Sequence, residues 1–505
     1  MTKTTPHTSN GSSADALDRE ILVLGAVVVL GTIMSILDVT IVNVAVPTLG
    51  GEYHASISTI QWVMTAYMLA FASVIPLTGW ATERFGAKRV WLTSLLLFMA
   101  GSVLAGLSWS IGSLIAFRVL QGLGGGMILP VGQTILAQAA GPQRMGRVMS
   151  AIGVPMLLGP ILGPVLGGAI VEAASWRWIF FVNVPVGIAA VAAAQRLLPD
   201  AKPQLGQRLD LRGLALLSPG IALFLYGVTE AGSKGGFAHT RTIAAALAGV
   251  TMVALFIVHA SVRGRAALID VSLFLRRGFA TAAAVNFLVG LALFGALILL
   301  PLYYQLVRHE SPLATGLLLV PQGLGAALAM PVAGRLTDEI GARRVVPAGI
   351  VFAGLGTLAF TQVSSTTSYA LLGAALFVVG LGLGATIMPS MAAAFQTLSR
   401  DETPRAASAL NAIQRIAGAI GTAVLAIVLQ RTIESNVPSL DGGIQAMSSL
   451  APEEQAHLTA AVAQSFGTTF WVAVAITATS LVPAFLLPRP RREQRQVQAA
   501  LGEAA

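Results

Sequence analysis

Fourteen long apolar runs, separated by short polar stretches, divide this chain. Each run holds about 20 residues, the length that an α-helix needs to cross the hydrocarbon core of a bilayer. The runs occupy residues 22–46, 57–80, 90–107, 113–135, 148–171, 179–198, 213–229, 242–260, 279–304, 314–334, 345–362, 369–391, 406–430 and 469–487. This pattern predicts an all-α integral membrane protein with fourteen transmembrane helices.

Composition supports the same class of protein. Hydrophobic residues make up 55% of the chain and charged residues only 10%, whereas soluble domains carry about 25% charged residues. The first twenty residues are polar and lack the apolar core of a secretory signal peptide. We therefore expect the first helix to act as an uncleaved signal anchor.

The basic residues predict the orientation of the chain in the membrane. With the N-terminus in the cytoplasm, 2 Lys and Arg lie in the N-terminal tail, 18 in the predicted inner loops and 4 in the C-terminal tail, against 5 outside. Because basic residues concentrate on the cytoplasmic side, we expect a multi-pass protein of the cell inner membrane with both termini cytoplasmic. The same bias accounts for the net charge of +9, so we expect the lipid bilayer, and no nucleic acid, as a partner.

An internal repeat indicates how the helices are grouped. The stretch "GWATERFGAKR" (79–89) aligns without gaps to "GRLTDEIGARR" (334–344), which places Glu83 over Asp338. The first copy follows the second apolar run and the second copy follows the tenth, so two helices are inserted between two halves of six, as in transporters with parallel repeats. The predicted regions are a tail (1–20), a six-helix bundle (21–198), an inserted hairpin with its loops (199–262), a second six-helix bundle (263–488) and a basic tail (489–505).

Several kinds of chemistry lack their residues in this chain. None of the four lysines follows a glycine, so the chain has no GK[ST] loop for a nucleotide phosphate. It has no cysteine, and its six histidines are scattered, which argues against a metal site. Because no nucleophile or cofactor constellation appears either, we expect neither an enzyme nor a bound cofactor.

Two charges of opposite sign lie deep in the apolar runs. Asp38 lies ~12 Å below the expected outer end of its helix, and Arg118 ~8 Å below the outer end of its own. An ionisable residue inside the membrane is a functional hypothesis by default. We expect the two side chains to pair, or to compete for one proton, so that moving the arginine away frees a carboxylate for a proton from outside. The alternative is a static pair that only holds two helices together.

More specific patterns appear in six stretches of the chain. They are "LDVTIVNVAVP" (37–47), "QWVMTAYMLA" (61–70), "RVLQGLGGG" (118–126), "GPILGPVLGG" (159–168), "WRWIFFVNVPVG" (176–187) and "LPLYYQLVRHESPLATGLLLVPQGLG" (300–325). Together they resemble the fourteen-helix drug:proton antiporter family of the major facilitator superfamily, over nearly the whole chain. The resemblance implies the major facilitator fold with two pseudo-symmetric bundles. It also implies a monomer that exchanges protons for small-molecule substrates.

The fifth apolar run combines small and helix-weakening residues. Gly159, Gly163 and Gly167 recur at spacing four and line one face, where another helix can approach closely. Pro160 and Pro164 interrupt the backbone hydrogen bonds of the same segment. The resemblance implies a hinge that seals the path between the bundles, and the alternative is ordinary helix packing.

The first copy of the repeat predicts a latch at the inner end of the second helix. Glu83 and Arg84 come just inside the membrane, and Gly86 provides a tight turn. The family has Asp where this chain has Glu83, which keeps the charge. We expect Glu83 to stabilise the outward-facing state, and Asp338 is its counterpart in the second copy.

Polar and aromatic residues near the middle of the apolar runs are candidates for a substrate cavity. They are Asn43, Gln61, Tyr67, Asn286, Gln322, Asn411 and Gln414. Each alone is more often a helix–helix hydrogen bond than a ligand contact. Arg415 lies near the inner end of its run, and we expect its side chain to reach the interface and anchor the helix.

These features together predict a proton-coupled exporter. The first hypothesis is an antiporter that moves lipophilic, often cationic drugs by alternating access. The alternative keeps the fold and changes the cargo to an endogenous metabolite, an antibiotic or a lipid.

Overall fold

The computed structural model describes residues 10–141, 144–200, 208–233, 236–237, 239–437 and 452–488. Within these ranges the regular structure consists of α-helices and three short 3₁₀ helices. The first half contains α1 (Asn10–Tyr53), α2 (Ile57–Val74), α3 (Leu77–Phe85), α4 (Ala87–Gly106), α5 (Ile111–Ala140), α6 (Met145–Ala173), α7 (Trp178–Phe181) and α8 (Asn183–Leu197). The middle contains α9 (Leu211–Ser233) and α10 (Thr240–Arg263), followed by η1 (Gly264–Ala266) and η2 (Val271–Leu275). The second half contains α11 (Arg277–Leu306), α12 (Pro312–Leu318), α13 (Val320–Ile340), α14 (Ala342–Ala359), η3 (Phe360–Gln362), α15 (Tyr369–Gly384), α16 (Ile387–Gln396), α17 (Thr403–Asn436), α19 (Pro452–Thr479) and α20 (Leu481–Phe485).

The predicted all-α membrane architecture is confirmed. Among the described residues, 12 segments are long and apolar enough to span a bilayer, and α2 with α3 forms one further span that is bent by 55°. The helix α6, which has 29 residues, contains the whole of the remaining predicted run 148–171, and some of its side chains lie outside the described residues. The number fourteen is therefore consistent with the observed spans and stays a prediction.

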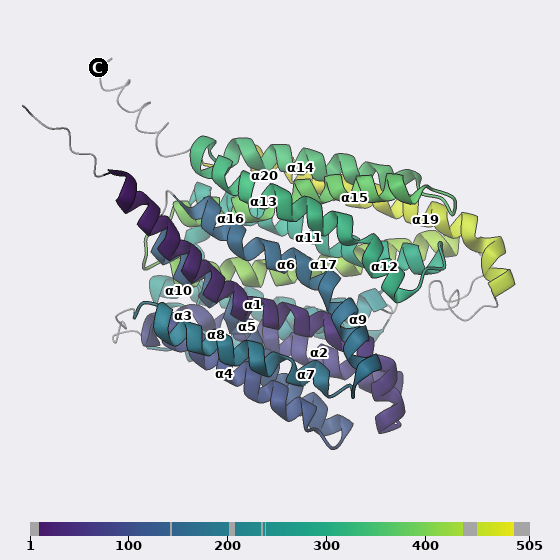
Figure 1. Ribbon diagram of the computed structural model, residues 1–505, viewed down its shortest axis with the longest axis horizontal. Helices are drawn as coiled ribbons and strands as arrows, with labels where there is room; N and C mark the ends of the chain where they lie inside the picture. The colour runs from purple at the N-terminus through teal and green to yellow at the C-terminus, as the bar shows by residue number, and fades with distance from the viewer. Residues whose placement is uncertain are drawn as a thin grey trace, which may run out of the picture.

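The helices form two bundles that lie side by side, and most helices run roughly along the long axis of the molecule (Figure 1). Figure 1 shows α1 to α5 with α7 and α8 on one side, and the green and yellow helices from α11 onward on the other. In the first bundle α5 packs against α2 and α4, and in the second α11 packs against α17 and α13 against α15. Glycines allow close helix packing in both bundles, as Gly101 on α4 does against α5 and Gly421 on α17 does against α11.

Two elements contact both bundles. The helix α6 packs along α1 of the first bundle and along α13 and α16 of the second. On another side α9, from the inserted hairpin with α10, packs against α2 and α17. The rings of Trp62 on α2 and Tyr226 on α9 stack with centroids 5.8 Å apart. The inserted hairpin therefore covers the seam between α2 and α17.

The first helix is longer than its apolar run predicts. It begins at Asn10 and ends at Tyr53, whereas the run covers residues 22–46. No proline lies between Asn10 and Leu22 to stop the backbone hydrogen bonds. After Tyr53 the chain turns at His54, whose φ is 45°, and Ser56 caps α2 by accepting a hydrogen bond from the Thr59 amide.

The two copies of the repeat have the same backbone. The helix α3 ends at Gly86 with φ 88° and ψ 143°, and α13 ends at Gly341 with φ 87° and ψ 149°. In both copies the next helix begins at the following residue. Because a side chain strains the backbone at positive φ, glycine is the residue that permits so short a connection. The predicted tight turn at Gly86 is confirmed.

Candidate functional site

The site is built around the two charges in the first bundle. Asp38 on α1 and Arg118 on α5 are 0% and 1% exposed, and Arg118 Nη1 donates to Asp38 Oδ2 over 2.6 Å. The predicted pairing is therefore present. A charge-assisted hydrogen bond of this length is among the stronger interactions in proteins. In a buried site it also satisfies two groups that would be costly to leave alone.

The other oxygen of the carboxylate is bound by two amides. Gln121 Nε2 donates to Asp38 Oδ1 over 2.8 Å, and Asn183 Nδ2 donates to the same oxygen over 3.2 Å. Gln121 also accepts from Arg118 Nη1 over 2.7 Å, so it bridges the two charged groups. Both oxygens of Asp38 are thus hydrogen-bonded, so the carboxylate leaves no acceptor without a partner in this buried site.

A serine on α4 completes the network. Ser102 Oγ accepts from Gln121 Nε2 over 3.1 Å and from Asn183 Nδ2 over 3.0 Å. It donates in turn to the Phe180 carbonyl over 2.8 Å. Sequence analysis missed these three partners of the charged pair. A signal was available for Gln121, which follows Arg118 by three residues and therefore shares its helix face.

The guanidinium of Arg118 rests on α2. Its Nε donates to the Val63 carbonyl over 3.2 Å, and its Cζ lies 4.0 Å from the centre of the Tyr67 ring. This distance is typical of a cation–π contact. Tyr67 was predicted as a substrate contact, and in this state its ring packs against Arg118 instead. The arginine is therefore held by α2 and α5 as well as by Asp38.

A second ion pair joins the two bundles. Glu83 on α3 binds Arg405 on α17 through two hydrogen bonds of 2.8 Å, from Nε to Oε1 and from Nη2 to Oε2. Both side chains are buried. Arg405 also donates to the carbonyls of Arg265 and Ala267, which lie in the connection after α10. We call the end of the molecule where α3 ends and α17 begins the latch end.

The second copy of the repeat also crosses between the bundles at the latch end. Asp338 on α13 accepts hydrogen bonds from the backbone amides of Gly146 and Arg147, over 2.8 Å and 3.2 Å. These amides belong to the first turn of α6, where the unsatisfied N–H groups and the helix dipole favour an anion. Arg84, the remaining predicted latch residue, lies partly buried in the last turn of α3.

Glycine lets the backbones of the two bundles approach at the latch end. A Cβ on Gly79 would lie 3.0 Å from Arg405 Cα, and one on Gly334 would lie 2.7 Å from the Gly146 carbonyl oxygen. Gly79 and Gly334 occupy the same position of the repeat. Deeper in the seam, Asn411 Nδ2 on α17 donates to Gln133 Oε1 on α5 over 2.6 Å. Asn411, a predicted cavity residue, therefore joins the bundles in this state.

The predicted glycine face on α6 packs against α1. A Cβ on Gly159 would overlap Ile36, and one on Gly163 would overlap Thr40. A Cβ on Gly167 would lie 3.1 Å from the Ile41 carbonyl oxygen. The predicted close approach is confirmed, and the role as a hinge stays a prediction. Pro160 and Pro164 lie within α6, and their side chains fall outside the described residues.

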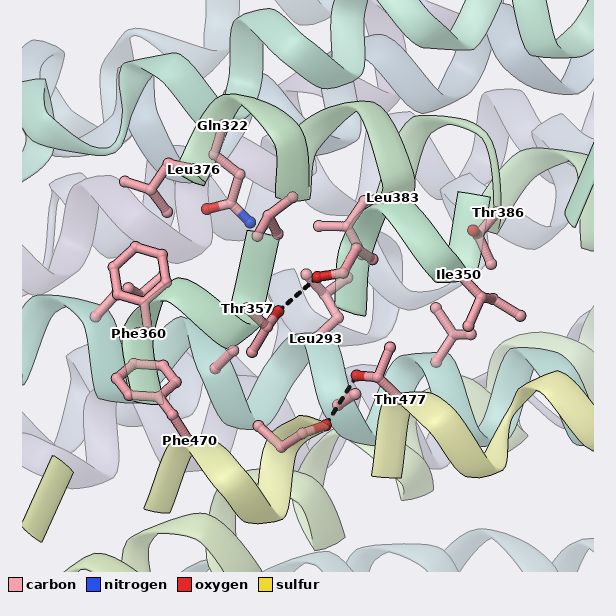
Figure 2. Close-up of a pocket in the computed structure, with 17 residues that line it drawn as sticks. Leu293, Gln322, Ile350, Thr357, Phe360, Leu376, Leu383, Thr386, Phe470 and Thr477 are labelled. Carbon is pink, nitrogen blue, oxygen red and sulfur yellow. Dashed lines mark hydrogen bonds between the residues drawn. The ribbon is translucent and has the colours of Figure 1, made fainter. Parts of the chain in front are cut away.

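The remaining predicted cavity residues do not form one group. Asn43 and Gln61 are exposed, Gln414 is buried on α17, and Asn286 donates to the Ala282 carbonyl of its own helix over 2.9 Å. Gln322 lines a mostly apolar pocket inside the second bundle. Figure 2 shows its amide beside aliphatic and aromatic side chains, and two threonine hydroxyls in the same pocket bonded to carbonyls of their own helices.

Comparison with known proteins gives the family. The model of the Major Facilitator Superfamily matches residues 28–422. A Multidrug resistance protein B homolog of Mycobacterium tuberculosis (strain H37Rv) is 39% identical over 97% of this chain and 94% of its own length. Multidrug export protein EmrB of Haemophilus influenzae is 33% identical over 78% of each chain.

Solved structures agree on the fold. The human organic anion transporter MFSD10 (TETRAN) superposes with a TM-score of 0.61 at 18% identity, over 90% of this chain and 99% of its own. The proton:xylose symporter XylE superposes with a TM-score of 0.58 at 12% identity, over 92% and 96%. Identity at this level supports the fold alone. On the family match and the curated relatives together, this chain belongs to the major facilitator superfamily of membrane transporters.

Proposed function

We propose that this protein is a proton-coupled antiporter that exports lipophilic compounds across the cell inner membrane by alternating access. The observation that carries the proposal is Asp38, a fully buried carboxylate whose partner Arg118 comes from another helix. The names of the relatives, a multidrug resistance protein homolog and a multidrug export protein, support the choice of export and of drug-like substrates. The chain works as a monomer, with both termini and the latch end in the cytoplasm.

In this state the cytoplasmic path is closed. Glu83 and Arg405 join α3 to α17, and Asp338 joins α13 to the start of α6. Both contacts must break before the bundles can separate at the latch end. The glycine face of α6 then provides the surface over which α1 and α6 rearrange, because side chains there are too small to lock the two helices.

Protonation of Asp38 is the switch. An ionised Asp38 holds Arg118, Gln121 and Asn183 around it, and through them α5 and α8. A neutral Asp38 loses its charge-assisted bond to Arg118, which keeps its contacts with the Val63 carbonyl, the Gln121 amide and the rings of Tyr67 and Phe180. The packing of α1 against α5 is thereby weakened, and the proton enters from the side opposite to the latch end.

The coupled proton supplies enough free energy for useful export. Moving one proton through ~100 mV releases ~2.3 kcal/mol, and one unit of pH difference adds ~1.4 kcal/mol. Their sum supports a gradient of a few hundred-fold for a neutral substrate, at about 1.4 kcal/mol for each factor of ten.

Lipophilicity is the property we propose that the substrates share. The sequence-based expectation of cationic drugs assumes that Asp38 faces the substrate. In the structure both of its oxygens are engaged within the first bundle. An apolar pocket such as the one around Gln322 suits a lipophilic group of either charge.

The test is proton movement in proteoliposomes. The vesicles contain wild-type protein and an internal pH dye. When substrate is added and crosses the membrane, protons should move in the opposite direction. The Asp38→Asn variant should no longer move protons. The substrate gradient that it can sustain should then fall from a few hundred-fold to about onefold, that is, to no gradient, while it still carries substrate down an existing concentration gradient. Glu230→Gln is the matched control, because Glu230 is an acid in α9 outside both bundles.

Two results would contradict the proposal. Substrate-driven proton movement that survives in folded Asp38→Asn protein would reduce Asp38 to a structural partner of Arg118. If Glu230→Gln loses proton movement and Asp38→Asn keeps it, the coupling site lies in the inserted hairpin instead.

A further inference from the structure

A third arginine lies within the length of a membrane-spanning helix, in the seam between the bundles. Arg415 is on α17, twelve residues after Thr403 where the helix begins, so it lies ~18 Å from the latch end. The predicted anchoring at the membrane interface is wrong. The Cζ of Arg415 lies 4.3 Å from the centre of the Phe71 ring on α2, which directs the side chain into the seam and away from the helix end.

The charge of Arg415 lacks the partner that the two buried arginines have. Arg118 pairs with Asp38 and Arg405 with Glu83. Among the residues that the structure describes, no carboxylate or carbonyl binds Arg415, and the Phe71 ring is its recorded contact. A guanidinium carries five N–H donors and stays charged. A transporter that keeps such a group inside the membrane without a partner needs one in another step of its cycle.

A polar group one helical turn from Phe71, inside the first bundle, is also without a hydrogen-bond partner. The hydroxyl of Tyr67 is fully buried and has no hydrogen-bond partner. Tyr67 precedes Phe71 by one helical turn, and the two rings are 5.9 Å apart. Arg415 itself is partly exposed although it lies far from either end of α17. The Arg415 side chain is therefore not sealed off by its neighbours.

We propose that Arg415 binds the carboxylate, or a similar anionic group, of a lipophilic substrate. This inference rests on the proposed export function and names a class of its substrates. A carboxylate matches the planar fork of a guanidinium with two parallel hydrogen bonds, and the Phe71 ring beside it accommodates an apolar neighbouring group. The exporter thus takes lipophilic acids and zwitterions in preference to simple cations.

The anion site and the proton site share one face of α2. Arg415 rests on Phe71, and Arg118 rests on Tyr67 one turn earlier. An anion that draws Arg415 off the Phe71 ring changes the packing next to Tyr67, and so next to the partner of Asp38. The geometry gives substrate binding a short physical route to the protonation switch.

The test uses two dyes that differ in one group. Rhodamine 110 carries a free carboxylate, and rhodamine 123 is its methyl ester and a monocation. Purified wild-type protein should bind rhodamine 110 more tightly, as measured by fluorescence anisotropy. The Arg415→Gln variant should weaken rhodamine 110 binding about tenfold to a hundredfold, which is the range for one charged hydrogen-bonding partner, and change rhodamine 123 binding by less than about twofold.

The controls separate this inference from the export proposal. Arg335→Gln removes a charge from an exposed arginine on α13 and should change neither affinity. Asp38→Asn should lose proton movement and keep the preference for rhodamine 110, so each proposal fails on its own measurement. Decanoate in excess should displace rhodamine 110 from the wild type, which needs no variant to fold.

The inference is overturned by any of three results. They are equal affinity of the wild type for the two dyes, equal loss of both dyes in Arg415→Gln, and failure of decanoate to displace rhodamine 110. If Arg415→Gln does not fold, Arg415→Lys keeps the charge and should still prefer rhodamine 110. A reversed preference in that variant also overturns the inference.

Discussion

Both copies of the repeat join the bundles at the latch end. Their backbone conformations are the same, but the groups that bind the acid of each copy differ. In the first copy the acid, Glu83, binds a side chain, Arg405, through two hydrogen bonds. In the second copy the acid, Asp338, accepts hydrogen bonds from the backbone amides of Gly146 and Arg147 at the start of a helix, and the half-exposed Arg147 side chain adds a longer ion pair of 3.7 Å. The positive-φ glycines that follow both acids have nearly the same φ and ψ.

This difference shows which contact can be switched more easily. The ion pair of Glu83 needs a full charge on a side chain that can swing away. The backbone amides at the start of α6 carry a partial positive charge of about half an elementary charge, which moves only if the helix moves, and the Arg147 charge beside them is half-exposed and therefore screened. Asp338 is therefore tied to the same helix that carries the glycine face at Gly159, Gly163 and Gly167. Opening the latch end requires the Glu83–Arg405 ion pair to separate in the first copy and α6 to move away from Asp338 in the second.

Breaking the ion pair should have the largest effect. Arg405→Leu leaves Glu83 buried without its partner, and loss of one member of a buried pair destabilises by about 3–5 kcal/mol. The chain has no cysteine, so a single Ala406→Cys at a fully buried position beside Arg405 reports opening. Its reaction with a water-soluble maleimide should accelerate by roughly two to three orders of magnitude, at about 1.4 kcal/mol for each tenfold change.

The control for this prediction exchanges the charges. Glu83→Arg combined with Arg405→Glu restores an ion pair and should slow the maleimide reaction again relative to Arg405→Leu. Unchanged reactivity in Arg405→Leu would show that the Asp338 contact alone holds the latch end closed.

The sequence predicted the acids of the latch and missed the base. Glu83 and Asp338 appear in the repeat alignment, and Asp38 and Arg118 stand out because a charge in an apolar run needs an explanation. Arg405 does not stand out, since a basic residue before a helix at the cytoplasmic side is what any membrane protein has. Which acid it meets depends on how the two bundles face each other, and no local pattern encodes that.

The same limit explains the cavity and anchor predictions. A polar residue in an apolar run needs a hydrogen-bond partner, but the sequence does not show which residue that partner is. Asn411 finds Gln133 across the seam and Asn286 finds a carbonyl of its own helix. The depth of Arg415 was misjudged because an arginine side chain can reach an interface in many helices, and only the position of Phe71 on α2 shows where it points. The all-α membrane architecture was easier to predict, because it follows from hydropathy alone.

A weaker effect is expected in the second copy of the repeat. Asp338→Asn keeps an oxygen that can accept one backbone hydrogen bond and loses the charge at the helix start, a change of about 0.5–2 kcal/mol. Ser150→Cys, buried on α6 beside Gly334, is the reporter. Its maleimide reaction should accelerate about threefold to thirtyfold, less than that of Ala406→Cys in Arg405→Leu.

The matched control is Glu339→Gln, which removes the charge of the exposed neighbouring acid on α13 and should leave the Ser150→Cys reporter unchanged. Acceleration in Asp338→Asn as large as in Arg405→Leu would remove the distinction between the two copies.

The smallest effect is expected at Glu402, which supports the Arg405 side of the latch from outside the membrane. Arg276 binds Glu402 through hydrogen bonds of 2.6 and 3.0 Å, and these lower the pKa of the Glu402 carboxyl to about 2. A lowered pKa means that the contribution to stability is present above the ordinary glutamate value and is lost as the pH falls toward 2. Because Arg276 is 40% exposed, solvent screening limits this contribution to about 1 kcal/mol or less.

The measurement is the difference in melting temperature between wild type and Glu402→Gln as a function of pH. Taking the difference removes the titration of every other group. We expect it to stay constant from about pH 8 to about pH 5, since Glu402 is ionised throughout that interval in both the folded and the unfolded chain. Below the ordinary glutamate pKa of about 4.3 it should shrink, because the unfolded chain then binds a proton that the folded chain does not. A difference that disappears between pH 7 and pH 5 would mean that Arg276 does not hold Glu402 in its charged form. The first copy of the repeat would then depend on pH at its edge as well as on the Glu83–Arg405 pair at its centre.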